Sequence, residues 1–399
     1  MRRSLPLLAS LACAALPFAH AAAAAQAAAA QAAAALPPGT PTPRAERLAA
    51  DRARLAADLA AVEAFGHDDA FGAALQEVRA QANGEKWWPV ADGKVSLVTV
   101  EHWLDWNRPA AGRTLPTALD LELPGHPFTA LRDLSDQLHA HGIEFLYVSF
   151  PTRLQLEPAL VVPGLATPRA AGGAADGAIE ATPLFRGMVA AHTRFLQALN
   201  EAGVEVLDLA PEFAALHDAG EDDPRRRFLY HRFNMHWTPR AIELAAQRTA
   251  ERVAQMEWWK PGPYQEGKAF AVRRRVFEFM AEGNGHAPGA TPEPIAVNSI
   301  APLGAPLQKE AKQRGPIVLL GDSFADFHKE YSGAFHDQLF RFTGWPIDAI
   351  VPAGGAELQC REKLRRRGDG LAGKKVVIWL MQEAALVVSP QWKPVALFE

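Results

Sequence analysis

The sequence predicts an α/β fold in which a doubly wound, mostly parallel sheet carries helices on both faces. From residue 128 onward, apolar and β-branched runs alternate with segments of helical length. Such alternation is typical of βα units that build a parallel sheet. The last run, Lys-Val-Val-Ile-Trp-Leu at residues 375–380, is continuously apolar after its first residue. Strands that are buried on both faces have this character, so this run is expected near the centre of the sheet.

Local signals predict the individual elements. Leu131, Leu134 and Leu138 recur at helical spacing. Thr238 is a good N-cap, and Pro239 suits the first position of the helix that follows. Helices are expected at residues 128–141, 186–202, 239–257, 335–342 and 357–367. Strands are expected at residues 143–150, 204–209, 317–320, 347–351 and 375–380.

The chain ahead of this domain divides into three parts. Residues 1–21 have the charged start, the short apolar stretch and the small residues of an export signal peptide, which predicts a periplasmic protein. Residues 22–43 form an Ala/Pro-rich linker. Residues 44–127 form an N-terminal extension with a helix at 44–62, followed by a tryptophan-rich region that we expect to be mainly core.

The main domain is expected at residues 128–399. Two long stretches inside it, residues 162–182 and 266–306, are rich in Gly, Ala and Pro. This composition predicts surface loops.

Composition argues against several classes of protein. The 399 residues carry a net charge of −4, with a pI near 6.4. Nucleic-acid binders are usually basic, so no nucleic-acid partner is expected. Cys13 lies in the signal segment, which leaves Cys360 without an internal disulfide partner. The sequence has no HExxH motif and no cluster of cysteines, so we expect no metal site, and nothing indicates another cofactor.

Two motifs carry the candidate chemistry. Gly-Asp-Ser-Phe follows the apolar strand at residues 317–320, which places Ser323 on a tight turn. Asn-Met-His-Trp precedes the helix at residue 239 and supplies His236. A serine becomes nucleophilic when a base takes its proton, and a histidine from another loop can be that base. Asn234 stands two residues before His236, where an orienting group is expected.

An acyl-transfer site also needs donors for the developing oxyanion. The N–H of Ser323 is one candidate donor, and the N–H of Gly354 or Gly355 is the second. These glycines follow the strand at residues 347–351, so they are expected at the same edge of the sheet as the serine.

With these residues in place, the chain resembles the SGNH hydrolase-like domain of the periplasmic alginate O-acetyltransferases and related polysaccharide acetylation proteins. The likeness lies in Gly-Asp-Ser-Phe after a strand, in the earlier His-Trp-Thr, and in Tyr-Val-Ser-Phe-Pro-Thr-Arg at residues 147–153. Gln-Glu after the last strand also agrees. The resemblance spans roughly residues 128–387. In this group, as here, the histidine precedes the serine in the chain.

The resemblance implies acetyl transfer to a hydroxyl of an exopolysaccharide through an acetyl-serine. A membrane-bound O-acyltransferase would supply the acetyl group. Carried over by position, Ser323 is the nucleophile and His236 is the base, and Arg153 and Trp237 are the candidate substrate-binding residues. The family's acid falls at Asn234, which can orient the histidine but carries no charge to stabilise its cation.

Several interpretations stay open from the sequence. The site could work with Asn234 itself, or a different carboxylate such as Asp208 or Glu383 could serve. The domain could also have lost catalysis and bind polysaccharide as a secretion scaffold. A carbohydrate acetyl esterase, with water as the acceptor, is a further alternative.

Overall fold

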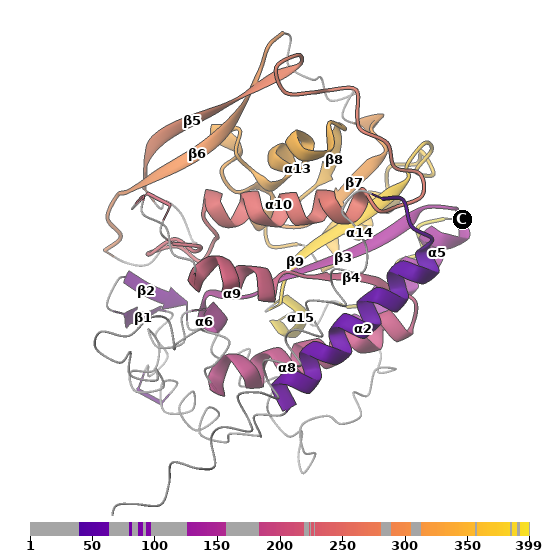
Figure 1. Ribbon diagram of the computed structural model, residues 1–399, viewed down its shortest axis with the longest axis horizontal. Coiled ribbons are helices and arrows are strands. Elements are labelled where there is room, and N and C mark those ends of the chain that lie inside the picture. The colour runs from indigo at the N-terminus through magenta and orange to yellow at the C-terminus, as the bar shows by residue number, and fades with distance from the viewer. Residues whose placement is uncertain are drawn as a thin grey trace, which may run out of the picture.

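The fold was analysed in a computed structural model of the chain (Figure 1). It describes residues 40–63, 80–81, 87–90, 93–96, 126–156, 183–218, 223, 225–226, 228–280, 289–304, 313–355, 357–383, 385–388 and 392–398. The expectations for the signal peptide, nearly all of the linker, most of the tryptophan-rich region and residues 162–182 lie outside these ranges.

A five-stranded parallel sheet is the centre of the fold, in the order β4-β3-β9-β7-β8. Its strands are β3 (Glu144–Phe150), β4 (Glu205–Asp208), β7 (Ile317–Leu320), β8 (Ile347–Ile350) and β9 (Val376–Gln382). β4 lies outside β3 at one edge of the sheet, and β8 lies outside β7 at the other. β9, the last strand in the sequence, lies between β3 and β7. Every residue of β9 is buried, which confirms the central strand expected from its apolar run.

Helices cover both faces of this sheet, as the alternating pattern predicts (Figure 1). One face packs mainly against α10 (Pro239–Val253), α13 (Phe335–Thr343) and α9 (Ala210–Asp218). The other packs mainly against α5 (Pro127–Ala140), α8 (Pro183–Glu201), α2 (Arg44–Glu63) and α14 (Gln359–Arg365). The short helices are α6 (Arg153–Leu156), α12 (Ser323–Asp326), α15 (Ala385–Val388) and the 3-10 turn η2 (Lys329–Tyr331). The doubly wound α/β class is therefore confirmed.

One sequence expectation inside the domain is wrong. The stretch at residues 266–306, expected as a loop, contains β5 (Phe270–Phe279) and β6 (Glu293–Pro302). These strands pair antiparallel over their whole length and form a ribbon beside α10 and α13 (Figure 1). The glycines lie outside both strands, and Pro294 and Pro302 lie only near the start and at the end of β6, so the average composition hid two β-rich runs. Another two-stranded ribbon joins β1 (Trp87–Val90) to β2 (Gly93–Ser96).

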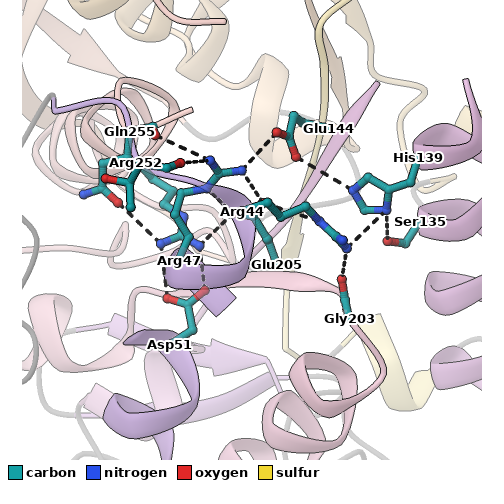
Figure 2. A network of polar contacts seen from close by, with 11 residues as sticks. Arg44, Arg47, Asp51, Ser135, His139, Glu144, Gly203, Glu205, Arg252 and Gln255 are labelled. Carbon is teal, nitrogen blue, oxygen red and sulfur yellow. Dashed lines mark hydrogen bonds and ion pairs between the residues drawn. The ribbon is translucent and has the colours of Figure 1, made fainter. Parts of the chain in front are cut away.

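Buried charges fasten α2 to the sheet (Figure 2). Glu205, the first residue of β4, receives two hydrogen bonds from Arg47, at 3.0 and 2.6 Å. It also accepts from Arg252 of α10 at 2.8 Å. Arg252 in turn binds Asp51 with both of its terminal nitrogens, and Arg47 reaches Glu144 at 3.0 Å. The helix outside the main domain is therefore tied to two strands and to α10.

Glu205→Gln should destabilise the protein by about 3–5 kcal/mol, because two buried guanidinium groups lose the negative charge that they share. The free energy of unfolding in urea measures this loss. Glu201→Gln, four residues earlier at an exposed position, is the matched control and should change stability by less than about 0.5 kcal/mol. Equal stability of the two variants would show that the network does not hold the fold.

In the parts of the chain that the structure describes, no helix is both long enough and apolar enough to cross a membrane.

Candidate active site

Ser323 lies directly beyond the carboxyl end of β7. Gly321 makes the turn, and a Cβ there would meet the Cβ of Ala325 at 3.0 Å, so a larger residue would crowd the turn. Asp322 caps α12 by accepting from the N–H of Phe324 at 2.8 Å. Burial raises the pKa of Asp322 to about 6. The turn therefore presents a half-buried serine hydroxyl at the edge of the sheet.

His236 sits on a loop that is closed by backbone pairing. The N–H of His231 donates to the carbonyl of His236 at 3.1 Å, and Thr238 donates to Leu229 at 2.9 Å. Trp237 holds the loop in place, because its indole N–H donates to the carbonyl of Phe324 at 2.9 Å. The loop before α10 and the turn after β7 are thus joined directly. Thr238 does start α10, but its hydroxyl donates to Phe228 instead of capping the helix.

The two loops bring the serine and the histidine together. Nε2 of His236 lies 2.9 Å from Oγ of Ser323. On its other side, Nδ1 of His236 lies 2.6 Å from Oδ1 of Asn234. Nucleophile, base and orienting group therefore stand in one line, as acyl-transfer chemistry requires.

The hydrogen bonds fix which histidine nitrogen is basic. Oδ1 of Asn234 also accepts the backbone N–H of His236, at 2.9 Å. A backbone N–H can only donate, so the Asn234 atom that faces it must be the oxygen. That oxygen cannot donate to Nδ1, so Nδ1 carries the ring proton. The lone pair is then on Nε2, which faces the serine hydroxyl.

Burial keeps the ring of His236 neutral. Its side chain is 7% exposed. Desolvation, together with a smaller effect of His231, lowers the pKa of His236 to about 3. The imidazole is thus free to accept a proton near neutral pH, but no carboxylate of the described residues contacts the ring to stabilise the imidazolium that forms.

Aromatic rings hold the plane of His236. Phe327 stacks on it with a centroid separation of 4.1 Å and an angle of 5°, and Phe324 lies 4.6 Å away. Both rings come from the segment that follows Ser323. Because these contacts need the folded turn, sequence spacing alone did not reveal Phe327 as part of the site.

Two further histidines, His231 and His328, contact each other and stabilise this segment. His328 has a positive φ of 68° and is 1% exposed. Its Nε2 lies 3.0 Å from Nε2 of His231, whose Nδ1 contacts Glu293 of β6. The pair therefore fixes the corner that carries Phe327. The sequence analysis missed Glu293 because it missed β6.

Two of the other expected site residues have structural roles. Trp237 is fully buried, so the expectation that it contacts substrate is wrong. It stacks on Phe150 at 4.3 Å. Arg153 is 7% exposed and donates to the carbonyls of His231 and Arg232, which holds the histidine loop. Substrate contact by Arg153 stays a prediction.

The glycines of the expected oxyanion site differ from each other. The N–H of Gly355 donates to the carbonyl of Pro352 at 3.1 Å, so it is used within a turn and the expectation for it is wrong. Gly354 is exposed at a φ of 62°. Within the described ranges, no acceptor takes the N–H of Ser323. Roles for the N–H groups of Ser323 and Gly354 stay predictions.

The alternative carboxylates lie elsewhere. Asn234 occupies Nδ1 of His236, while Asp208 and Glu383 gather around His192 on the other face of the sheet. This arrangement removes both of them as orienting acids for His236.

Comparison with known proteins agrees with this arrangement. The family of the SGNH hydrolase-like domain of the acetyltransferase AlgX matches residues 125–383. The chain belongs to this family. This SGNH hydrolase-like domain thus includes the serine, the histidine and the whole parallel sheet. Among curated proteins, none matches the sequence.

Several solved structures are similar to this SGNH hydrolase-like chain, among them the following three. The O-acetyltransferase domain of Pseudomonas putida AlgJ has a TM-score of 0.52 at 18% identity, over 77% of this chain and 93% of that one. Pseudomonas aeruginosa AlgX has a TM-score of 0.45 at 20% identity, over 64% of this chain and 56% of that one. Bacillus cereus PatB1 with a sulfonyl adduct has a TM-score of 0.38 at 12% identity, over 67% and 89%. The AlgJ likeness supports the fold.

Asn234→Asp should raise turnover by about tenfold or more, because a carboxylate stabilises the imidazolium that an amide cannot. The same charge raises the pKa of His236. Since the neutral ring is the base, the acid limb of the pH–rate profile should move to higher pH in the variant. Wild-type activity should stay flat down to about pH 5, above its pKa of about 3.

Hydrolysis of p-nitrophenyl acetate from pH 4 to pH 9 measures both effects. Met235→Leu, at the exposed position between the two residues, is the control and should leave rate and profile unchanged. A variant that matches wild type in both rate and profile would mean that Asn234 does not occupy the orienting position during turnover.

Proposed function

We propose that this protein transfers acetyl groups to hydroxyls of an alginate-like exopolysaccharide in the periplasm, through an acetyl-Ser323 intermediate. The distance of 2.9 Å between Nε2 of His236 and Oγ of Ser323 carries the proposal. Membership of the SGNH hydrolase-like acetyltransferase family supplies the type of reaction. The AlgJ structure is that of an O-acetyltransferase domain, and the corresponding activity is proposed here for this chain.

In the first half of the reaction, Oγ of Ser323 attacks the acetyl carbonyl of the donor. Nε2 of His236 takes the hydroxyl proton, and the imidazolium is held by the hydrogen bond from Nδ1 to Asn234. The tetrahedral intermediate then collapses, the donor group leaves with the proton from His236, and the serine is acetylated. A membrane-bound O-acyltransferase is the proposed donor system.

In the second half, a sugar hydroxyl attacks the acetyl-serine. His236 again takes the proton and returns it to Oγ of Ser323, which restores the free enzyme. Water in place of the sugar would make the protein an esterase. Because Asn234 carries no charge to stabilise the imidazolium, removal of the acetyl group from Ser323 should be slow. The acetyl-enzyme should therefore accumulate enough to be observed directly.

Ser323→Ala should abolish acetylation, with a loss of about 10³-fold or more in turnover. Incubation with p-nitrophenyl acetate, followed by mass spectrometry of the peptide that contains residue 323, detects the acetyl-serine. His236→Gln should lose it as well, because no base remains, whereas His141→Gln at an exposed position should keep it.

Added mannuronate oligosaccharides distinguish the acceptors. The transferase predicts acetylated oligosaccharide and faster release of p-nitrophenol, while an esterase predicts acetate alone. If Ser323→Ala equals wild type in acetyl release, catalysis at this site is refuted. Oligosaccharide that binds equally to both proteins, without acetyl chemistry, would indicate a scaffold.

A further inference from the structure

A second polar cluster lies at the carboxyl edge of the sheet, away from Ser323. It consists of His192 from α8, Asp208 at the end of β4 and Glu383 just after β9. One ligand atom from each residue lies within 4.8 Å of the others. Their exposed fractions are 3%, 2% and 2%, so the cluster is closed to bulk water.

The pleat of β3 separates this cluster from the catalytic residues. Oγ of Ser149 lies 3.0 Å from Nε2 of His192, while the next residue, Phe150, packs on Trp237 beneath His236. Successive side chains of a strand point to opposite faces. In register, Ser149 pairs with Asp208 and with Met381, two residues before Glu383. The cluster thus belongs to the face covered by α8.

The donor set is that of a metal site. A neutral imidazole and two carboxylates meet in a buried space, and all three are groups that bind divalent cations. Nε2 of His192 is turned toward Glu383, at 3.5 Å. One oxygen of Asp208 accepts the N–H of Ala210 at 2.9 Å, which fixes the direction of this carboxylate. A divalent cation would contact all three side chains at once.

Tyr147 gives an independent indication of a ligand. Its side chain is fully buried on the same face of β3 as Ser149, and its hydroxyl meets the geometry of a hydrogen bond to no described residue. Burial raises the pKa of this phenol, and the negative charges of Glu383 and Asp208 add to the effect. Arg54 of α2 also acts on Asp208, but its guanidinium is shared with Asp58, at 3.6 Å.

We propose that His192, Asp208 and Glu383 bind one divalent transition-metal cation, Zn²⁺ or Mn²⁺, that links α8 to the carboxyl ends of β4 and β9. Imidazole together with carboxylates suits these ions. The hydroxyl of Ser149, 3.0 Å from Nε2 of His192, stabilises the site from outside. The ion is structural, because the residues of the catalytic line are on the other side of β3.

This site also explains why the sequence predicted no metal. Histidine-rich motifs are recognised by close spacing, whereas these ligands come from three elements that only the fold brings together.

Metal analysis of the full chain, purified with a tag free of histidine and without chelators, tests the proposal. We expect about one equivalent of Zn²⁺ or Mn²⁺ per chain in wild type and in His141→Gln, whose histidine is exposed. His192→Gln and Glu383→Gln should hold almost none. Chelator-treated wild type should unfold at a temperature on the order of a few degrees lower, and Zn²⁺ or Mn²⁺, but not Mg²⁺, should restore it.

If the two variants fail to fold, metal binding by the wild-type protein alone tests the proposal. Co²⁺ added to the chelator-treated protein should give saturable visible absorption at one equivalent, which Zn²⁺ removes. Wild type without metal, and without a saturable response to Zn²⁺, Mn²⁺ or Co²⁺, would overturn the proposal and leave a pair of carboxylates that shares a proton. Metal retained equally by Glu383→Gln and His192→Gln would overturn it too.

Discussion

One carbonyl oxygen controls the chemistry of the candidate active site. Oδ1 of Asn234 accepts both the backbone N–H and the ring Nδ1 of His236. The backbone bond orients the amide, the amide sets the tautomer, and the tautomer directs a lone pair at Ser323. An amide can thus perform the geometric part of a carboxylate's role. It cannot perform the electrostatic part, because it carries no negative charge. Asn234 therefore orients the ring of His236 without stabilising its cation.

The parallel sheet places two polar sites close together without mixing them. Strands that end at one edge bring side chains from distant parts of the sequence to the same rim. Because successive side chains of a strand point to opposite faces, His236 lies against one face of the sheet and His192 with its carboxylates against the other. The packed apolar layer of the sheet keeps the two electrostatic environments apart, although they share a strand.

The sequence predicted those parts of the fold whose signals are local. β7 has the expected bounds, because an apolar run ends at a glycine turn. The pairing of Ser323 with His236 followed from motif order. The sequence placed Asn234 at the orienting position but left Asp208 and Glu383 open as alternatives, because only the folded sheet shows which of these side chains lies beside His236. The prediction of a loop at residues 266–306 was wrong, because the turn-forming residues around β5 and β6 dominate the average composition of this stretch.

The buried charges of α2 also determine the direction in which the polypeptide enters the domain. Glu144 and Glu205, which hold Arg47, are the first residues of their strands, so this anchor is at the amino edge of the sheet. Thr42 is fixed there as well, by its N–H to the carbonyl of Gln255 at 2.8 Å. Ser323 opens at the opposite edge. A bead or surface coupled just ahead of Thr42 would leave the serine pointing outward, which suits immobilised assays on long polymers.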